Sequence, residues 1–360
     1  MLFRSMCDLP TTTIPAGSRT LTATYLGNGS FAPSGTTTGY QVAQRGTTTT
    51  LSSDRPTGGL YGQPIAFTAT VASVEVNGST VTPTGTVSFS DGTATIGSCT
   101  LSAGSCTFTT SALATGPHSI VAYYQGTNDF VVSSSSALTP TIGGATTTTA
   151  LTTSSAIATA GTPVIFTATV SGQGTQTGTI SFRDETGTEL STCTLVNEIC
   201  SISISSLAPG TRSITAVYSG DDNNAGSTSN AVTQVIRATT TTTITSSANP
   251  AGYAAPITFS VTVATDTTTA TGSVTIRDGA ATLTTCTLSG GSCTWTTSSP
   301  LSLGDHAITA TYAGDAGHAG STSGTLTQTI ETVATTTTVT SNVNPSAYRQ
   351  TVRYTILVES

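Results

Sequence analysis

The segment that decides the fold is residues 286–312, CTLSGGSCTWTTSSPLSLGDHAITATY. Two further copies lie at residues 193–218, CTLVNEICSISISSLAPGTRSITAVY, and 99–124, CTLSAGSCTFTTSALATGPHSIVAYY, and the second half of a fourth lies at residues 7–25. The tyrosine that closes each copy recurs every 94 to 99 residues. A repeat of this length matches a single domain, whereas solenoid repeats of about 20 to 50 residues cannot bury a core alone. The chain is therefore predicted to be a tandem array of domains.

The phase of the repeat predicts three complete modules and two partial ones. The complete modules are expected at about residues 46–142 (module two), 145–236 (module three) and 238–330 (module four). Residues 1–44 match only the last half of a module, and residues 333–360 match only its first strands. We therefore expect the chain to be a fragment of a longer reading frame. The end pieces should be less stable than the complete modules, because they lack partner strands.

Alternation of apolar and polar residues predicts the strands. In module two, Ile65, Phe67, Ala69 and Val71 alternate with polar residues, and the next run ends on Asp91-Gly92, a hairpin turn signal. Many short strands, turn signals about every ten residues and no helical period predict an all-β fold of tandem antiparallel β-sandwiches, with about seven strands per module.

Threonine runs mark each junction between modules. They lie at residues 47–50, 146–149, 239–243 and 335–338. Threonine favours strands and is a poor flexible linker, so each run is predicted to lead directly into a first strand. Short junctions of this kind favour an elongated, semi-stiff, monomeric rod.

Composition excludes several classes of protein. Charged residues make up 8% of the chain, the net charge is −7, and all ten basic residues are arginine. Nucleic-acid binding would need a basic stripe to neutralise phosphates, which this chain lacks. No run of about 18 apolar residues encodes a membrane span, and the N-terminus lacks the apolar region of a secretion signal, which is therefore expected upstream.

Six of the seven cysteines form pairs spaced seven residues apart. The pairs are Cys99 and Cys106, Cys193 and Cys200, and Cys286 and Cys293. Each pair lies in a strand-turn-strand pattern that is expected to place its cysteines opposite each other on one hairpin, within reach of a disulfide. Disulfides indicate an oxidising compartment. Cys7 matches the second member of a pair and is expected to be unpaired.

Two sets of repeated segments resemble those of a known protein family. SIVAYYQGTNDF (119–130), SITAVYSGDDNNAGSTS (213–229) and AITATYAGDAGHAGSTS (307–323) are preceded by TGTVSFSDG, TGTISFRDETG and TGSVTIRDG. They resemble bacterial immunoglobulin-like (Ig-like) repeats of the group 3 type, found in long cell-surface and secreted proteins. The resemblance implies an extracellular or cell-surface array of Ig-like sandwiches that serves as stalk, spacer or adhesive module. Two departures are the incomplete ends and the absence of an anchor or effector domain.

Recurrent acidic residues are assigned to turns. The run from Gly220 to Asn224 with Asp221 could suggest calcium ligands, but the other modules lack the paired aspartates, and Asp, Asn and Gly are favoured in solvated turns. Asp91, Asp184 and Asp278 each stand alone at a hairpin turn, so they are not expected to be catalytic. No metal site, cofactor site or enzymatic activity is predicted.

Other recurrent residues also have structural explanations. His118 and His306 share a position with Arg19 and Arg212, which indicates a polar strand start rather than a proton shuttle. The tyrosines that close the copies (Tyr25, Tyr124, Tyr218 and Tyr312) are expected to pack with their hydroxyls on main-chain groups, as in the tyrosine corner of sandwich domains. The single tryptophan, Trp295, is expected in or near the core, although an exposed Trp on a sheet could bind sugar.

An insertion in module two is the best candidate for a contact site. Its segment VEVNGSTV makes module two about five residues longer than its neighbours and contains the hairpin signal Asn77-Gly78. Loops on a rigid scaffold are where binding evolves, so this loop is a candidate contact site; the alternative is a hairpin extension without function. The candidate residues are Val74, Glu75, Val76, Asn77, Gly78 and Ser79.

These observations favour a non-catalytic structural or adhesive array that contacts an unknown surface or extracellular ligand, either protein or glycan. An alternative is an accessory, carbohydrate-binding array of a secreted glycan-active enzyme. An enzyme in its own right would need a convergent set of catalytic groups, which the sequence does not offer.

Overall fold

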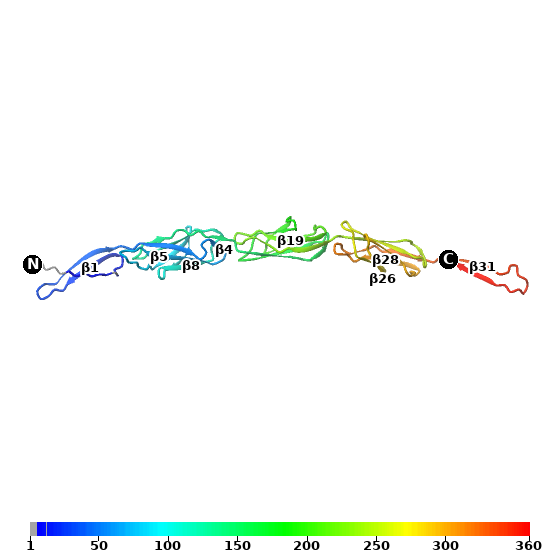
Figure 1. Cartoon of the computed structure of the whole chain (residues 1–360), viewed down its shortest axis with the longest axis horizontal. Coiled ribbons are helices and arrows are strands. Elements are labelled where there is room, and N and C mark those ends of the chain that lie inside the picture. The colour runs from blue at the N-terminus through cyan, green and yellow to red at the C-terminus, as the bar shows by residue number, and fades with distance from the viewer. Residues whose placement is uncertain (1–5, 12) are drawn as a thin grey trace.

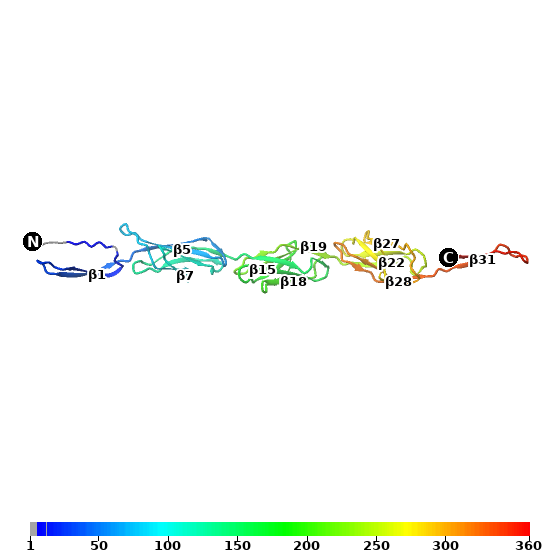
Figure 2. The ribbon, with the colours of Figure 1, turned by 90° about the horizontal axis from the view of Figure 1, so that it is seen from below.

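The chain forms a row of β-sandwich modules placed end to end. The computed structural model describes residues 6–11 and 13–360, and every regular element in that part is a β-strand. Figures 1 and 2 show that the modules follow one another along a single long axis, from the N-terminal hairpin to the C-terminal one. The elongated shape agrees with the expectation from the threonine runs at the junctions.

The strands repeat in the same order in each module. Module two contains β3 (Thr47–Ser53), β4 (Gly58–Leu60), β5 (Ile65–Ser73), β6 (Thr86–Asp91), β7 (Ala94–Thr100), β8 (Ser105–Thr110), β9 (Gly116–Pro117), β10 (Ile120–Tyr124), β11 (Ser133–Ser134) and β12 (Thr141–Gly143). Module three contains β13 (Thr148–Thr153), β14 (Ile157–Thr159), β15 (Val164–Ser171), β16 (Thr179–Arg183), β17 (Glu189–Thr194), β18 (Ile199–Ile204), β19 (Gly210–Tyr218), β20 (Ser227–Thr228) and β21 (Val232–Arg237). Module four contains β22 (Thr241–Ser246), β23 (Ala251–Gly252), β24 (Thr258–Ala264), β25 (Ser273–Asp278), β26 (Ala281–Thr287), β27 (Ser292–Thr296), β28 (Gly304–Tyr312), β29 (Ser321–Thr322) and β30 (Leu326–Glu331).

Modules three and four each consist of a small sheet packed on a larger one, and in module two the counterpart of the larger sheet is divided into β11-β10-β6-β7 and β4-β12-β9. In module three the small sheet has the order β13-β15-β18, and the larger sheet has the order β14-β21-β19-β16-β17. Module four repeats this order with β22-β24-β27 and β23-β30-β28-β25-β26. The first strand of the larger sheet runs parallel to the last strand of the module, as β14 does to β21, and the other pairings are antiparallel. The prediction of tandem antiparallel Ig-like sandwiches is confirmed.

Every module has its own hydrophobic core between the two sheets. Alternate side chains of β5, β15 and β24 point inward, so that Phe67, Phe166 and Phe259 are fully buried at equivalent positions. Opposite them lie apolar residues of the larger sheet, such as Phe182 and Ile214 in module three. No buried cluster includes residues of two modules. The period-two pattern of the sequence therefore predicts correctly which face of each strand is inside.

Two-stranded hairpins flank the three sandwiches. β1 (Gly17–Tyr25) pairs with β2 (Ser34–Val42), and β31 (Thr336–Ser341) pairs with β32 (Tyr354–Glu359). Apolar side chains that are buried in the complete modules are exposed here, among them Tyr25 (45% exposed) and Ile356 (67% exposed). These hairpins lack a second sheet on which to pack, which is consistent with the expected lower stability of the two end pieces.

The three cysteine pairs form disulfides that join the two sheets of each sandwich. Cys99 lies in β7 of the larger sheet and Cys106 in β8 of the small sheet, with their Cα atoms 5.9 Å apart. The pairs in modules three and four have Cα separations of 6.0 and 6.1 Å. The expectation that both cysteines face each other across one hairpin is wrong, because the chain crosses from one sheet to the other between them. The crossing carries a leucine (Leu101, Leu195 or Leu288) that is buried in the core.

Candidate functional site

The junctions between modules are held by main-chain hydrogen bonds. Module three ends at Arg237 in β21, and the next residue, Ala238, already pairs with module four. The amide of Ala238 donates to the carbonyl of Gly317 at 2.8 Å, and the amide of Ala319 donates to the carbonyl of Ala238 at 2.9 Å. No unpaired residue separates the two modules at this junction, which limits their relative motion.

The same arrangement recurs at the other two junctions. The amide of Ala145, two residues after the end of β12, donates to the carbonyl of Asn223 at 2.8 Å. The amide of Arg45, three residues after the end of β2, donates to the carbonyl of Asp129 at 2.8 Å. In each case the partner lies in the next module, in the loop that follows the strand ending at the repeated tyrosine (β10, β19 or β28). This loop, here called the junction loop, spans residues 125–132, 219–226 and 313–320 in modules two, three and four.

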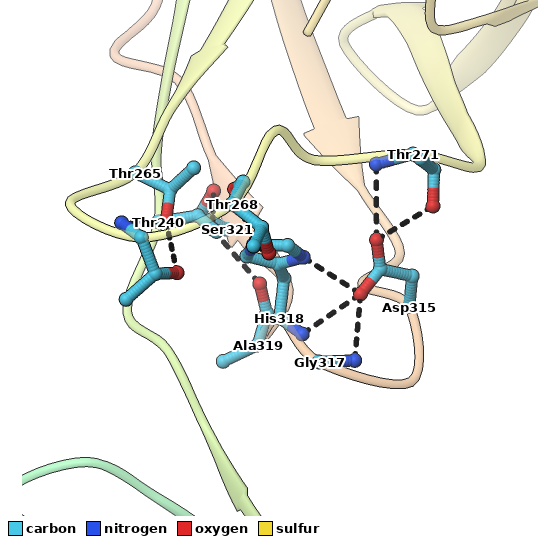
Figure 3. A network of polar contacts seen from close by, with 10 residues as sticks. Thr240, Thr265, Thr268, Thr271, Asp315, Gly317, His318, Ala319 and Ser321 are labelled. Carbon is cyan, nitrogen blue, oxygen red and sulfur yellow. Dashed lines mark hydrogen bonds and ion pairs between the residues drawn. The ribbon is translucent and has the colours of Figure 1, made fainter. Parts of the chain in front are cut away.

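A buried carboxylate organises the junction loop of module four. Oδ2 of Asp315 accepts hydrogen bonds from the amide and hydroxyl of Thr271 at 2.9 and 2.8 Å, as Figure 3 shows. Oδ1 accepts hydrogen bonds from the amides of Gly317 and His318, both at 2.8 Å. The ring of His318 is buried, with Nδ1 2.8 Å from Asp315 Oδ1 and Nε2 2.8 Å from the carbonyl oxygen of Thr268. Asp315 therefore fixes the loop that receives the chain from module three.

Asp221 has the same role in module three. Its carboxylate accepts hydrogen bonds from the amides of Thr177, Asn223 and Asn224 and from the hydroxyl of Tyr218. Burial alone would raise the pKa of Asp221, but these donors outweigh it and hold the pKa far below its usual range. Burial and the neighbouring Asp221 raise the pKa of Tyr218 to about 12. The structure thus assigns Asp221 to the loop, where both of its oxygens have protein donors.

The neighbours of Asp221 contribute to the junction as well. The hydroxyl of Thr115 in module two donates to the carbonyl oxygen of Asp222 at 2.5 Å, so that the loop of module three also contacts the preceding module. In the described residues, no group of three or more His, Cys, Asp or Glu side chains is arranged to hold a metal ion.

Two of the three turn aspartates have a histidine partner, which the sequence analysis missed. Nδ1 of His118 lies 2.6 Å from Asp91 Oδ2, and Nδ1 of His306 lies 2.6 Å from Asp278 Oδ2. The expectation that each aspartate stands alone is wrong for Asp91 and Asp278. Asp184 instead accepts hydrogen bonds from the amides and hydroxyl of its own turn. The spacing of 27 or 28 residues between aspartate and histidine gives no local signal of the pairing.

The histidines replace an arginine that does the same work in module three. Nε2 of His118 lies 2.7 Å from the carbonyl oxygen of Ala114, four residues earlier. Arg212 donates to the carbonyl of Ala208, also four residues earlier, and to Glu185 at 3.0 Å. Both side chains therefore connect the loop that precedes them to the turn that follows β6 in module two or β16 in module three. The polar position identified in the sequence is a cationic brace.

The histidine braces favour the charged imidazolium. Because both ring nitrogens of His118 face acceptors, both must donate, which requires the protonated ring. Burial lowers the pKa of His118, but the hydrogen bonds to Asp91 and to the Ala114 carbonyl outweigh it and raise the pKa. The hydrogen bond to the Ser302 carbonyl and the pairing with Asp278 raise the pKa of His306. In both histidines Nδ1 contacts an aspartate and Nε2 contacts a main-chain carbonyl. A carbonyl oxygen is neither a nucleophile nor an acid, so these contacts do not form a catalytic pair with the histidine.

Three of the four tyrosines that close the repeats (Tyr124, Tyr218 and Tyr312) are buried, but their contacts differ from those of a tyrosine corner. The hydroxyl of Tyr124 donates to the carbonyl of Thr84 at 2.6 Å, and that of Tyr218 donates to Thr177 at 2.7 Å. These partners lie about 40 residues upstream, in the loops before β6 and β16, rather than at the adjacent corner. In the described part of the chain the buried hydroxyl of Tyr312 has no hydrogen-bond partner, and Tyr25 is exposed.

Trp295 packs in module four and is not exposed on a sheet face. Its ring stacks on that of Phe259 with centroids 6.1 Å apart, and it belongs to the edge of the core cluster. The free cysteine of the described residues is Cys7, which is exposed.

The candidate contact loop of module two is a hairpin next to the first junction. Val76 and Ser79 pair across its tip, and Asn77 and Gly78 both have positive φ, as a turn of type I′ requires. The guanidinium of Arg45 donates to the carbonyl of Ser79 at 2.6 Å. Val74, Val76 and Val81 are each about half exposed. The loop therefore contacts the start of its own module and presents a small apolar surface beside it.

No helix in the described residues is long and apolar enough to cross a membrane. The family model described as bacterial Ig-like domain (group 3) matches residues 49–143, 151–237 and 244–331. No curated protein matches the chain.

Several solved structures are similar to the chain at low identity. They include the Escherichia coli adhesin FdeC (11% identity, TM-score 0.35, covering 79% of this chain and 96% of that one) and the ICAM-5 D1–D4 ectodomain fragment (9%, 0.46, 82% and 80%). Fibronectin(III)-like modules of Clostridium thermocellum CbhA also match (18%, 0.23, 52% and 93%). Sandwich modules of many different functions share this architecture, so these similarities identify no ligand.

Proposed function

Because the chain belongs to the bacterial Ig-like domain (group 3) family, we propose that it is a stiff extracellular spacer that holds adhesive or other functional parts of a surface protein away from the cell. The observation that carries this proposal is the junction geometry. At the three junctions that lead into a complete module, the chain begins to pair with that module within three residues of the preceding strand. A spacer needs such junctions, because flexible linkers would let the array collapse into a coil.

The disulfides support the extracellular location. Each complete module has one disulfide between its sheets, and such bonds persist in oxidising compartments. We propose that residues 46–142, 145–236 and 238–330 fold as independent, non-catalytic modules of a monomeric rod. The loop of residues 74–79 is the proposed contact with a partner protein, since two of its valines, Val74 and Val76, and the neighbouring Val81 are half exposed near the junction.

The proposal is tested by measuring how the modules tumble. In a stiff rod, ¹⁵N relaxation of modules three and four should fit one strongly anisotropic diffusion tensor. A variant with Gly-Ser-Gly-Ser inserted between Arg237 and Ala238 should give separate, faster tumbling for the two modules. If the native chain already tumbles as separate modules, the stiff-spacer proposal is wrong.

A second candidate function is an accessory, carbohydrate-binding array of a secreted glycan-active enzyme. One observation favours it, which is an uncharged groove on the outer face of module two.

A further inference from the structure

Module two has a groove on the outer face of its larger sheet. The groove has a volume of about 730 Å³ and is open to solvent. It is formed by strands β6, β7, β10 and β11, which are neighbours in one sheet. The polar side chains that line the groove include those of Ser88, Ser90, Thr95, Tyr123, Gln125 and Ser134. None of the residues that line the groove carries a charge.

Module two differs from its neighbours at one position in the lining of this groove. Ser90 occupies the place of Arg183 in module three and Arg277 in module four. The equivalence follows from the pairing of β6 with β10, of β16 with β19 and of β25 with β28. Arg183 lies along the outer face of its own sheet, where Nε donates to the hydroxyl of Ser181 at 3.1 Å. Replacing the long arginine by serine removes this cover from the sheet.

Two further substitutions change the chemistry of the exposed surface. Tyr123 occupies the place of Val217 in module three and Thr311 in module four, and its side chain is 42% exposed. Gln125 replaces Ser219 and Ala313, and its Nε2 donates to the hydroxyl of Ser88 at 2.7 Å. Module two therefore combines an exposed aromatic ring with an amide and several hydroxyls.

The floor of the groove contains a polar group that the protein does not satisfy. Ser90 is 7% exposed, and in the described part of the chain its hydroxyl has no hydrogen-bond partner. A buried hydroxyl without a partner is costly, and such groups are rare in folded proteins. The oxygen itself is covered, so a ligand in the groove meets the other hydroxyls of the lining, such as that of Ser134, rather than this one.

We infer that this groove binds a neutral oligosaccharide. A sugar ring has an apolar face that can stack on Tyr123 and hydroxyl groups that can exchange hydrogen bonds with Gln125 and Ser134. The lack of charge in the lining disfavours acidic glycans and phosphorylated ligands, which need cationic partners. The inference gives the array a ligand class, and it does not depend on the rod, whose stiffness is tested separately.

The test is calorimetric titration of the full chain with cellohexaose, xylohexaose, mannohexaose and chitohexaose, and with hexagalacturonate as an acidic probe. We expect saturable binding of at least one neutral hexaose and none of hexagalacturonate. Tyr123→Ala should weaken binding at least tenfold. Ser90→Arg, which restores the residue found in modules three and four, should do the same in a context where the fold accepts arginine.

The matched control is Tyr253→Ala, which removes a tyrosine of similar exposure (50%) from module four. It should leave the affinity unchanged. The inference is overturned if none of the four neutral hexaoses binds at millimolar concentration, if Tyr123→Ala and Ser90→Arg leave the affinity unchanged, or if hexagalacturonate binds as well as the neutral sugars. Loss of binding in Tyr253→Ala alone would place the site elsewhere and would also overturn it.

Discussion

Ala238, the first residue after the last strand of module three, forms a parallel β-bridge with His318 in the junction loop of module four. The side chain of His318 is held by Asp315, whose carboxylate also binds Thr271 on the loop before the third strand. The junction between modules and the core of the loop are thus one hydrogen-bonded unit. The stiffness proposed for the array follows from this unit, because the residues that stabilise each module also receive the chain from the preceding one.

Asp315→Asn should destabilise module four by about 2–3 kcal/mol, because a buried charged acceptor of several hydrogen bonds is lost. Trp295 is the only tryptophan and packs on Phe259, so its fluorescence reports the unfolding of module four in the full chain. Denaturant titration followed by this signal gives the free energy of unfolding. The control is Asp266→Asn, an exposed position in the same module, which should have little effect. Equal losses in both variants would contradict the assigned role of Asp315.

Replacing Cys286 and Cys293 together by alanine should lower the stability of module four by about 2–3 kcal/mol, since the disulfide closes a short loop in the unfolded chain. The same fluorescence titration measures the change. Reductant should bring the native chain to the stability of the variant and leave the variant itself unchanged. A native chain that is equally stable with and without reductant would show that the bond does not form in solution.

The stability of module four should decrease as the pH rises through neutrality. The pKa of His306 is raised in the folded state above its ordinary value of 6.5, so the stabilisation from its pairing with Asp278 is complete below pH 6.5. It is lost as the pH rises through the folded-state pKa. The charged groups that face the ring are Asp278 and Asp305. His306→Arg, the residue type of Arg212 in module three, should reduce this pH dependence; an unchanged slope between pH 5 and 9 would refute the brace.

Tyr218→Phe should destabilise module three by about 1–2 kcal/mol, because the part-buried hydroxyl that the carbonyl of Thr177 and one oxygen of Asp221 share as a donor is lost. Hydrogen exchange of peptides from module three measures the effect in the full chain. Tyr253→Phe, at an exposed position, serves as the control and should leave exchange unchanged. Unaltered protection in Tyr218→Phe would mean that the hydroxyl contributes nothing to the module.

The fold could be predicted from the sequence because it depends on local, repeated patterns. The alternation Ile65, Phe67, Ala69, Val71 has one physical solution, a strand with one buried face, and the repeats present it three times. The pairing of Asp91 with His118 could not be predicted, since it joins two turns that come together only when the sheets fold. The three cysteine pairs could be predicted from their spacing and are formed, but their position between the two sheets could not, because the buried Leu101 directs the chain from one sheet to the other between Cys99 and Cys106.

The groove of module two was missed for a different reason. Its signal is a difference between repeats, Ser90 against Arg183 and Arg277, and that difference acquires meaning only when the strand pairing places the three positions on the same face. The insertion at residues 74–79 is visible in the sequence because it changes the repeat length, whereas a substitution within a strand leaves the length unchanged.

Small-angle X-ray scattering of the full chain can show whether the array is a stiff rod in solution. A stiff rod gives a pair-distance distribution with a long linear tail. Inserting Gly-Ser-Gly-Ser between Arg237 and Ala238 should then reduce the radius of gyration, although the chain becomes longer. If the native chain has no such tail and scatters like the insertion variant, the array is not a stiff rod.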